Sequence, residues 1–274
     1  MIKYICIYHK DCLDGLTAAW IVKSKYPDTL LIPADYGDKP PLELIDNDTH
    51  VFIVDFSYPS KELKSIEQIC NNLIVLDHHE SAIRKLESYP LKEHTLLHFD
   101  ITKSGAILTW EYFHSEHIMP AWIQAVGDRD IWEFKYPYTK EICEYIQSKP
   151  LTIEWLDEIH IMDINDIIER GIKLWKPKMD KWLKRIKEDS YRYEILGYNV
   201  PIINMHPTEG VSEVLNIMAK DEPFAMSYYH SKDQIIYSFR SAKDQEQSVN
   251  VAELAEQLGG GGHKHAAGWR INRI

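Results

Sequence analysis

The stretch Leu73-Ile74-Val75-Leu76-Asp77-His78-His79 decides the fold of this chain. Its first four residues are a short apolar run of the kind that fills a buried strand of a parallel sheet. An acid and two imidazoles follow at once, and α/β sheets carry their functional side chains at the carboxyl ends of such strands. The stretch therefore predicts a buried strand that presents polar ligands at its C-terminal end.

Three further segments repeat this order of an apolar run followed by acids or histidine, and we interpret each run as a strand. Tyr4–Tyr8 precedes His9-Lys10-Asp11-Cys12-Leu13-Asp14-Gly15, Val51–Val54 precedes Asp55, and Trp122–Val126 precedes Gly127-Asp128-Arg129-Asp130. A single Asp at a strand end, such as Asp14 or Asp55, commonly does no more than cap the next helix. Four such coincidences together favour convergence of these side chains on one point of a sheet.

The residue types indicate a hard divalent cation. Carboxylate and imidazole suit Mn²⁺ or Mg²⁺, whereas thiolate-rich sites favour Zn²⁺ or iron–sulfur clusters. The four cysteines, Cys6, Cys12, Cys70 and Cys143, show no close paired spacing, which predicts free thiols in a reducing compartment. Met1–Tyr4 leads directly into a strand and leaves no room for a signal peptide. We therefore expect a cytoplasmic protein in which Cys12 is incidental.

Composition sets the class of substrate. The chain has 274 residues, 45% of them hydrophobic and 27% charged, as is typical of a soluble globular protein. No apolar run approaches the length needed to span a bilayer. The formal net charge of −11 argues against an enzyme that tracks long duplex nucleic acid, because such binding needs a basic surface. A small anionic substrate in a local cationic pocket fits this charge.

The first 135 residues alternate strand-like and helix-like segments, which predicts a doubly wound, mostly parallel α/β sheet. Expected strands span 3–8, 28–34, 51–55, 73–77 and 95–99, and expected helices span 14–25, 59–70 and 104–114. Ser104 or Thr102 is the expected cap of the last helix, and we interpret Gly105 as a residue that permits close packing.

The rest of the chain predicts a helical connector and a second, smaller α/β domain. Residues 136–195 have a helical pattern, and the amphipathic run Met179–Tyr193 is interpreted as a helix with a solvated charged face. Expected strands then span Tyr198–Ile203, Ala225–Tyr229, Gln234–Arg240 and Trp269–Ile271, with helices at 210–219 and 249–258. The expected domains are residues 1–135, 136–195 and 196–274.

Four glycines, Gly259–Gly262, precede His263. Gly259 is suited to end the helix at 249–258. The other three either form a flexible linker or a nest of backbone N–H groups that binds phosphate. The His-x-His and strand that follow favour the nest, with His263 as a further donor.

These motifs resemble a known family. The order His-x-Asp-x-x-Asp-Gly, strand-Asp, Asp-His-His and Gly-Asp is similar to that of the DHH phosphoesterases, which include RecJ-type exonucleases, nano-RNases, cyclic-dinucleotide phosphodiesterases, exopolyphosphatases and family II pyrophosphatases. Ser238-Phe239-Arg240-Ser241 and Gly259–Gly268 look like the DHH-associated C-terminal domain. The resemblance thus reaches both ends of the chain and leaves about residues 135–195 without a matching motif.

The resemblance implies a two-metal hydrolase whose ligands would be His9, Asp11, Asp14, Asp55, His78 and Asp128. Asp55 would bridge the ions, and Asp130 competes with Asp128 for the last position. Two residues separate Asp11 from Asp14, whereas one residue separates the corresponding acids in many members of the family. Asp77 and His79 would be catalytic, with His79 reaching the substrate phosphate. The second domain would bind substrate through Arg240, Ser241, Gly260, Gly261, Gly262 and His263.

Two Mn²⁺ ions, or Mg²⁺ or Co²⁺, roughly 3.5–4 Å apart would generate a hydroxide for in-line attack on phosphorus. We expect an enzyme that hydrolyses short oligonucleotides or linear or cyclic dinucleotides. The sequence leaves its oligomeric state open, with a homodimer as one candidate. One alternative is a phosphomonoesterase or polyphosphatase acting on bisphosphonucleotides, pyrophosphate or polyphosphate. Another is a nucleotide-binding sensor without turnover, which metal content and turnover would distinguish from an enzyme.

Overall fold

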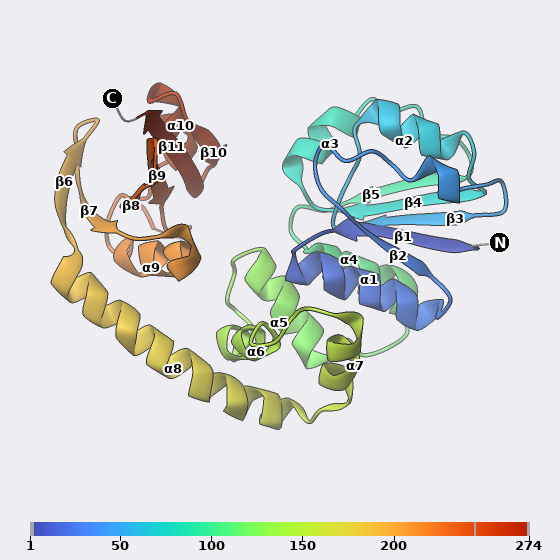
Figure 1. The fold of residues 1–274 in the computed structure, drawn as a ribbon, viewed down its shortest axis with the longest axis horizontal. Helices are drawn as coiled ribbons and strands as arrows, with labels where there is room; N and C mark the ends of the chain where they lie inside the picture. The colour runs from blue at the N-terminus through green and yellow to red at the C-terminus, as the bar shows by residue number, and fades with distance from the viewer. Residues whose placement is uncertain (1–2, 244, 273–274) are drawn as a thin grey trace. The chain divides into compact units, whose positions relative to one another are not determined.

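The computed structural model describes residues 3–243 and 245–272. The chain divides into two compact units, residues 1–175 and 176–274, and each contains its own sheet (Figure 1). This confirms the predicted α/β class with a second, smaller sheet domain. The boundary lies inside one long helix, and the assignment of residues 136–195 to a separate connector stays a prediction.

The first unit is built on a five-stranded sheet in the order β2-β1-β3-β4-β5, in which every neighbouring pair is parallel. Each strand lies within two residues of its predicted position. The strands are β1 (Tyr4–His9), β2 (Leu30–Ala34), β3 (His50–Val54), β4 (Asn72–Asp77) and β5 (Thr95–Phe99). A sheet of this order changes its winding direction between β1 and β3.

Helices cover both faces of this sheet, with α2 (Ser60–Glu67) and α3 (Glu80–Leu86) on one face and α1 (Leu13–Lys25) and α4 (Gly105–His114) on the other (Figure 1). Alternation along β3 shows why. Phe52 and Val54 pack with the α1 and α4 side chains, whereas Val51 and Ile53 pack with those of α2. Successive strand residues point to opposite faces, so a strand buried on both must be apolar throughout.

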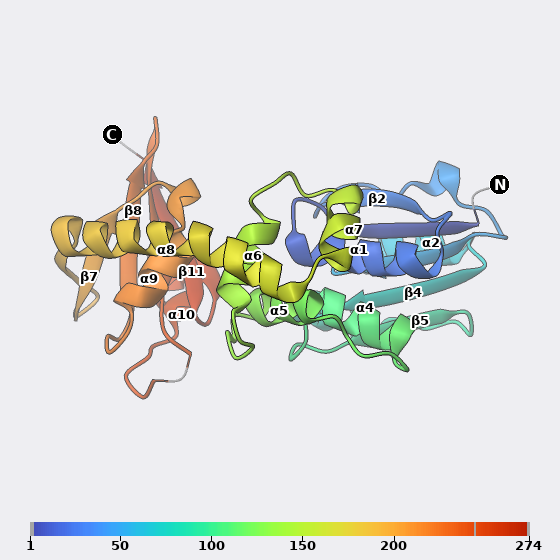
Figure 2. The ribbon, with the colours of Figure 1, turned by 90° about the horizontal axis from the view of Figure 1, so that it is seen from below.

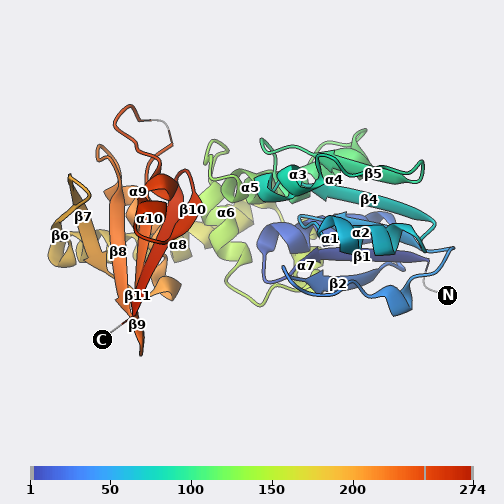
Figure 3. The same cartoon turned by 90° about the horizontal axis from the view of Figure 1, so that it is seen from above.

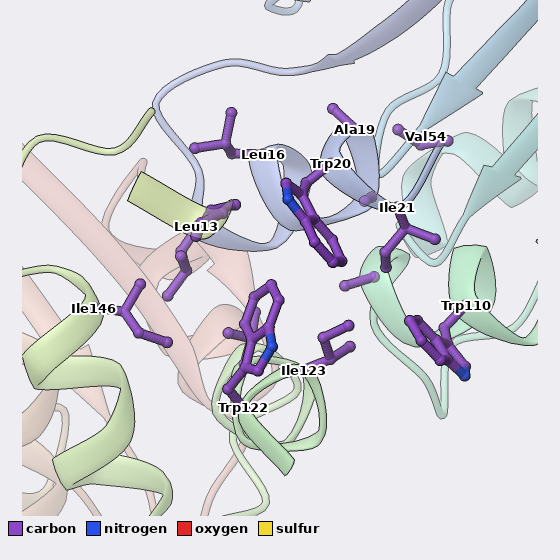
Figure 4. Close-up of a cluster of buried hydrophobic side chains, with 14 of the residues drawn as sticks. Leu13, Leu16, Ala19, Trp20, Ile21, Val54, Trp110, Trp122, Ile123 and Ile146 are labelled. Carbon is purple, nitrogen blue, oxygen red and sulfur yellow. The ribbon is translucent and has the colours of Figure 1, made fainter. Parts of the chain in front are cut away.

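The prediction of a strand at Trp122–Val126 is wrong. Residues Ala121–Asp130 form helix α5, which starts directly after Pro120. Trp122 and its neighbours are buried against α1, with the Trp20 and Trp122 ring centroids 5.3 Å apart at an interplanar angle of 72° (Figure 4). A run of five residues, four of them apolar, is too short for its periodicity to distinguish a buried helix from a buried strand.

The chain then continues as predicted in helices, α6 (Thr139–Ile146), α7 (Ile153–Ile161) and α8 (Ile164–Asp189). The prediction of helix through Tyr193 is wrong at its end, because Tyr191–Ile195 form a strand, β6. Alternating Tyr191, Tyr193 and Ile195 favour a strand there. No helix within the described residues has the length and apolar character needed to cross a bilayer.

The second unit carries a six-stranded sheet in the order β10-β11-β9-β8-β7-β6, antiparallel except for the β7–β8 pair. The remaining elements are β7 (Tyr198–Asn204), α9 (Val211–Met218), β8 (Ala225–His230), β9 (Gln234–Arg240), α10 (Val251–Gln257), β10 (Gly261–His263) and β11 (Ala266–Asn272). Helices α9 and α10 pack on opposite faces of this sheet (Figures 2 and 3). Arg240 of β9 donates a hydrogen bond to Ser212 of α9, whereas the side chain of its neighbour Phe239 packs with α10.

Candidate metal centre

The carboxyl ends of β1, β3 and β4 bring three of the sequence motifs to one edge of the first sheet. His9 is the last residue of β1, Asp55 follows β3 directly, and Asp77 ends β4 just before His78 and His79. This edge includes the β1/β3 position where the winding direction changes, which is where open α/β sheets form their binding sites.

Five side chains there form two overlapping groups of ligand atoms. His9, Asp55 and His79 make one group, and Asp14, Asp55 and His78 make the other. Within each group, one ligand atom from each residue lies within 4.8 Å of the other two. Because Asp55 belongs to both groups, its two carboxylate oxygens are placed to serve two cations.

Asp55 is almost fully buried and has a positive φ of 51°, a backbone conformation that Asp tolerates better than most residues. Its Oδ1 lies 3.1 Å from His78 Nε2, and its Oδ2 lies 3.6 Å from His9 Nδ1. Oδ2 and His9 Nδ1 are both buried, and neither has a hydrogen-bond partner among the described residues. Unpaired buried polar atoms are costly, and a cation between them would remove that cost.

Two more carboxylates surround His78. Asp14, in the first turn of α1, lies 3.2 Å through both oxygens from the backbone N–H of Ala106 at the start of α4. Asp130 Oδ2 lies 3.3 Å from His78 Nε2. Burial, with the charges of Asp130 and Asp55, raises the pKa of Asp14 well above its usual range. Burial and the charge of Asp55 also raise the pKa of Asp130, to about 6. A divalent cation relieves such crowding of buried carboxylates.

Asp77 orients the histidines. It is fully buried, and its Oδ1 accepts hydrogen bonds from His79 Nδ1 at 2.7 Å and the His78 backbone N–H at 2.7 Å. Its Oδ2 accepts one from Ser57 Oγ at 2.6 Å. Burial raises the pKa of Asp77, but the hydrogen bond from His79, the charge of His79 and the hydrogen bond from Ser57 together outweigh burial, so the net shift is downward. With Nδ1 engaged, Nε2 is the nitrogen that His79 has left for a ligand or a substrate.

Gly15 and Gly105 allow the motifs to approach this closely. A Cβ at Gly15 would lie 2.4 Å from the carbonyl oxygen of His9. A Cβ at Gly105 would lie 2.4 Å from Asp55 Cβ and 2.9 Å from Asp14 Oδ2. Ser104 caps α4 by accepting a hydrogen bond from the Ile107 backbone N–H. Gly105 therefore packs closely, as predicted, and the residues that it packs against are Asp55 and Asp14 of the candidate site.

The structure does not bring Asp128 or Asp11 into either group. The Asp128 carboxylate accepts hydrogen bonds from the backbone N–H groups of Lys135 and Tyr136, at 2.9 and 3.0 Å, and from Thr139 Oγ1. It thus holds the loop between α5 and α6. Asp11 is exposed, with a φ of 54°. Asp130, two residues along the helix from Asp128 and thus on another side of it, reaches His78 instead.

In the second unit, the predicted substrate contacts are engaged within the fold. Arg240 donates to the Phe239 carbonyl oxygen at 2.8 Å and to Ser212 Oγ at 3.0 Å, and Ser241 Oγ donates to the Val249 carbonyl oxygen at 2.8 Å. His263 is exposed on β10.

The glycine run lies partly in a strand. Gly261 and Gly262 pair with β11, and a Cβ at Gly260 would lie 2.2 Å from the Gly268 carbonyl oxygen. Close backbone packing therefore accounts for Gly260. Gly259–Gly261, Ser238 and Gly268 contribute to the lining of a hollow of about 420 Å³. The phosphate nest stays a prediction.

Comparison with known proteins adds a family and a fold. No family model matches the chain. The uncharacterized protein R106 of Acanthamoeba polyphaga mimivirus is 30% identical over an alignment of 291 positions, which covers 98% of this chain and 68% of the viral protein. The chain belongs to the same family as R106. The R106 family therefore includes this arrangement of two α/β units.

Solved structures share the fold of this chain. The pGpG-specific phosphodiesterase PggH from Vibrio cholerae superposes with a TM-score of 0.60 at 15% identity, over 98% of this chain and 94% of PggH. RecJ from Thermus thermophilus, in complex with Mn²⁺, superposes with a TM-score of 0.51 at 16% identity, over 98% of this chain and 50% of RecJ.

Proposed function

We propose that this member of the R106 family is a divalent-metal-dependent phosphoesterase that hydrolyses short oligonucleotides or linear or cyclic dinucleotides. One observation carries the proposal: buried Asp55 is shared by two groups of carboxylate and imidazole ligand atoms. Two-metal sites that use a shared carboxylate are typical of phosphate-ester hydrolysis. The DHH-type fold that the chain has in common with a pGpG phosphodiesterase and a nuclease supports the same chemistry.

The donors fit Mn²⁺ or Mg²⁺, with Co²⁺ as a further candidate, because they are oxygens and imidazole nitrogens. His9 and Asp55 would hold one cation, and Asp14, Asp55 and His78 the other, with Asp130 in place of Asp128 as the fourth residue of the second group. When bound, such cations lower the pKa of a water molecule and offset the charge on the departing oxygen.

The chain's own residues provide orientation and neutralise phosphate charge. Asp77 engages Nδ1 and fixes the His79 ring, so that Nε2 is the nitrogen left to contact a substrate phosphate. Asp14, Asp55 and Asp77 are buried, so bulk water has little access to the inner side of the site. In the second unit we propose that Arg240, Ser241, His263 and Gly260–Gly262 bind substrate phosphates, as the resemblance implies.

The test is turnover of a substrate panel by the purified protein with Mn²⁺ and then with EDTA. The panel contains a 5′-labelled dinucleotide, pentanucleotide and 24-mer, a cyclic dinucleotide, 3′,5′-bisphosphoadenosine and pyrophosphate. We expect mononucleotide release from the short oligomers, abolished by EDTA and by His78→Ala. Turnover confined to pyrophosphate or the bisphosphate would establish the monoesterase alternative. A metal-loaded protein without turnover on any substrate would indicate a sensor.

Two neighbouring aspartates offer a matched test of the ligand set. Asp130→Asn removes a carboxylate 3.3 Å from His78 and should weaken Mn²⁺ binding at least about tenfold without lowering the stability of the metal-free protein. Asp128→Asn disturbs three hydrogen bonds of the α5–α6 loop. It should therefore lower the free energy of unfolding by about 1–3 kcal/mol and leave Mn²⁺ affinity unchanged. Titration calorimetry measures the Mn²⁺ affinity of each variant, and thermal unfolding measures its stability. A loss of Mn²⁺ affinity in Asp128→Asn but not in Asp130→Asn would identify Asp128 as the ligand.

Cation binding should depend on pH through His78. Burial lowers the pKa of His78, but the hydrogen bond with Asp55 and the charges of Asp14 and Asp130 outweigh it and raise the pKa to about 9. The metal-free protein therefore carries a protonated His78 at pH 7, whereas a metal ligand must be neutral.

Binding should then release at least one proton at pH 7, and Asp14, whose pKa is also raised, adds to this release. Mn²⁺ affinity should therefore rise by at least about tenfold per pH unit until it levels off near pH 9. Calorimetry in buffers of different ionisation enthalpy measures the released protons. Affinity that does not change between pH 6 and 8 would show that His78 is not a ligand.

A further inference from the structure

Tyr36 lies at the rim of the metal centre, on the loop that follows β2. Its ring centroid is 5.7 Å from that of His9 and 6.1 Å from that of His79, both in edge-on geometry. Phe56, which is buried, supports the ring from beneath at 5.4 Å. The side chain is nevertheless 50% exposed. Tyr36 therefore borders the first ligand group and remains open to a molecule that arrives there.

The loop holds Tyr36 in place before any ligand binds. The Tyr36 backbone N–H donates to Asp35 Oδ1 at 2.7 Å, and the Asp35 backbone N–H donates to Asp38 Oδ2 at 2.8 Å. Lys10 Nζ lies 3.5 Å from Asp35 and 3.7 Å from Asp38, which ties the turn to the end of β1. A pre-positioned side chain loses little conformational entropy when it makes a new contact.

The hydroxyl group of Tyr36 has no hydrogen-bond partner among the described residues. A phenol ordinarily carries its proton at neutral pH, and the Tyr36 ring lies beside the rings of His9 and His79. A protonated hydroxyl that has no partner and lies beside a candidate cation site can donate a hydrogen bond to an anion bound there.

We propose that Tyr36 binds substrate at this centre by donating a hydrogen bond from its hydroxyl to a non-bridging oxygen of the phosphoryl group that His79 contacts. This inference rests on the proposed function. The acceptor is the phosphoryl group rather than a base or sugar, so Tyr36 acts on every phosphoester that the site takes. A hydrogen bond to a charged group contributes more binding free energy than one between neutral groups. A donor fixed beside a phosphoryl oxygen also stabilises the charge that develops there in the transition state.

The test is Tyr36→Phe, which removes the hydroxyl and keeps the ring on Phe56. We expect kcat/KM to fall by roughly 10- to 100-fold on each substrate that the wild type turns over. Bound Mn²⁺ and thermal stability should stay unchanged. The matched control is Tyr112→Phe on α4, a tyrosine 42% exposed that lies outside both ligand groups, and it should behave as wild type.

A second measurement keeps the inference testable without turnover. Inorganic phosphate should bind the Mn²⁺-loaded Tyr36→Phe protein at least about fivefold more weakly than the wild type. A wild type that binds Mn²⁺ but hydrolyses nothing would contradict the proposed function, and this phosphate titration would still decide the role of Tyr36.

Two results would overturn the inference. One is Tyr36→Phe with wild-type phosphate affinity and wild-type turnover. The other is a loss seen only in Tyr36→Leu and only on substrates that carry a base, which would assign to the ring a stacking role and to the hydroxyl none.

Discussion

Replacing Asp55 with Asn should remove the binding of both cations and lower turnover by on the order of 10³-fold or more. Asp55 is the residue common to the two ligand groups, and its Oδ2 is a buried atom without a hydrogen-bond partner among the described residues. Asn keeps the shape of the side chain and is tolerated at the positive φ of 51° that this position has. The substitution therefore tests charge rather than backbone conformation. Metal analysis after dialysis and turnover of a dinucleotide measure the two effects.

The stability of the variant distinguishes a lost site from a lost fold. Burial raises the pKa of Asp55, but the neighbouring His78 and His9 outweigh burial and hold this pKa well below its usual range. The Asp55 carboxylate is therefore charged, and it lies near Asp14 and Asp130. Asn keeps an Oδ1 that can accept a hydrogen bond from His78 but loses the charge that His78 and His9 stabilise. We expect the metal-free variant to unfold cooperatively at a temperature below that of the wild type, and to gain none of the stabilisation that Mn²⁺ gives the wild type. A variant that retains two ions would rule out the shared-ligand role.

The first sheet could be predicted from the sequence because its strands are apolar on both faces. Runs such as Val51–Val54 and Leu73–Leu76 have no polar position, and a strand covered on both sides accommodates that pattern. The same argument predicts the wrong element at Trp122–Val126. There the apolar run belongs to a helix packed on α1, and five residues do not distinguish the two periods.

The candidate site could be predicted where ligands directly follow strands. His9, Asp55 and His78 lie at strand ends, so their convergence follows from sheet topology alone. Asp128 and Asp130 lie on a helix instead, where the direction of a side chain depends on the exact turn. With two acids in Gly127-Asp128-Arg129-Asp130, sequence order could not say which one reaches His78.

Tyr36 and Gly105 show what the sequence could not supply. Tyr36 comes from a loop between motifs, and only the fold of that loop places it beside His9 and His79. Gly105 was expected to permit close packing, but its partner, Asp55, lies 50 residues earlier in the chain. Contacts of this kind arise from the way α4 docks on the sheet, which no local pattern encodes.

Gly105→Ala adds one methyl group, and we expect it to displace Asp55 and to lower both stability and turnover. The new Cβ would lie 2.4 Å from Asp55 Cβ and 2.8 Å from Asp55 Cα, so neither a rotamer change nor solvent can relieve the clash. Either the start of α4 or the end of β3 must move. We expect the free energy of unfolding to fall by about 1–3 kcal/mol. We also expect turnover to fall by about 100-fold, because a displacement of about 1 Å at a reacting centre has that effect.

The matched control is Gly171→Ala on α8, whose Cβ would lie 2.1 Å from the Glu141 carbonyl oxygen. This clash is also with backbone, in the same unit, but it touches none of the ligand groups. Both variants should unfold more easily, and only Gly105→Ala should also lose Mn²⁺ affinity and turnover. Equal destabilisation with wild-type turnover in both would mean that the Asp55 carboxylate tolerates movement of its backbone. A loss confined to Gly105→Ala would show that the glycine is needed for the position of Asp55, and so for the geometry of both ligand groups at once.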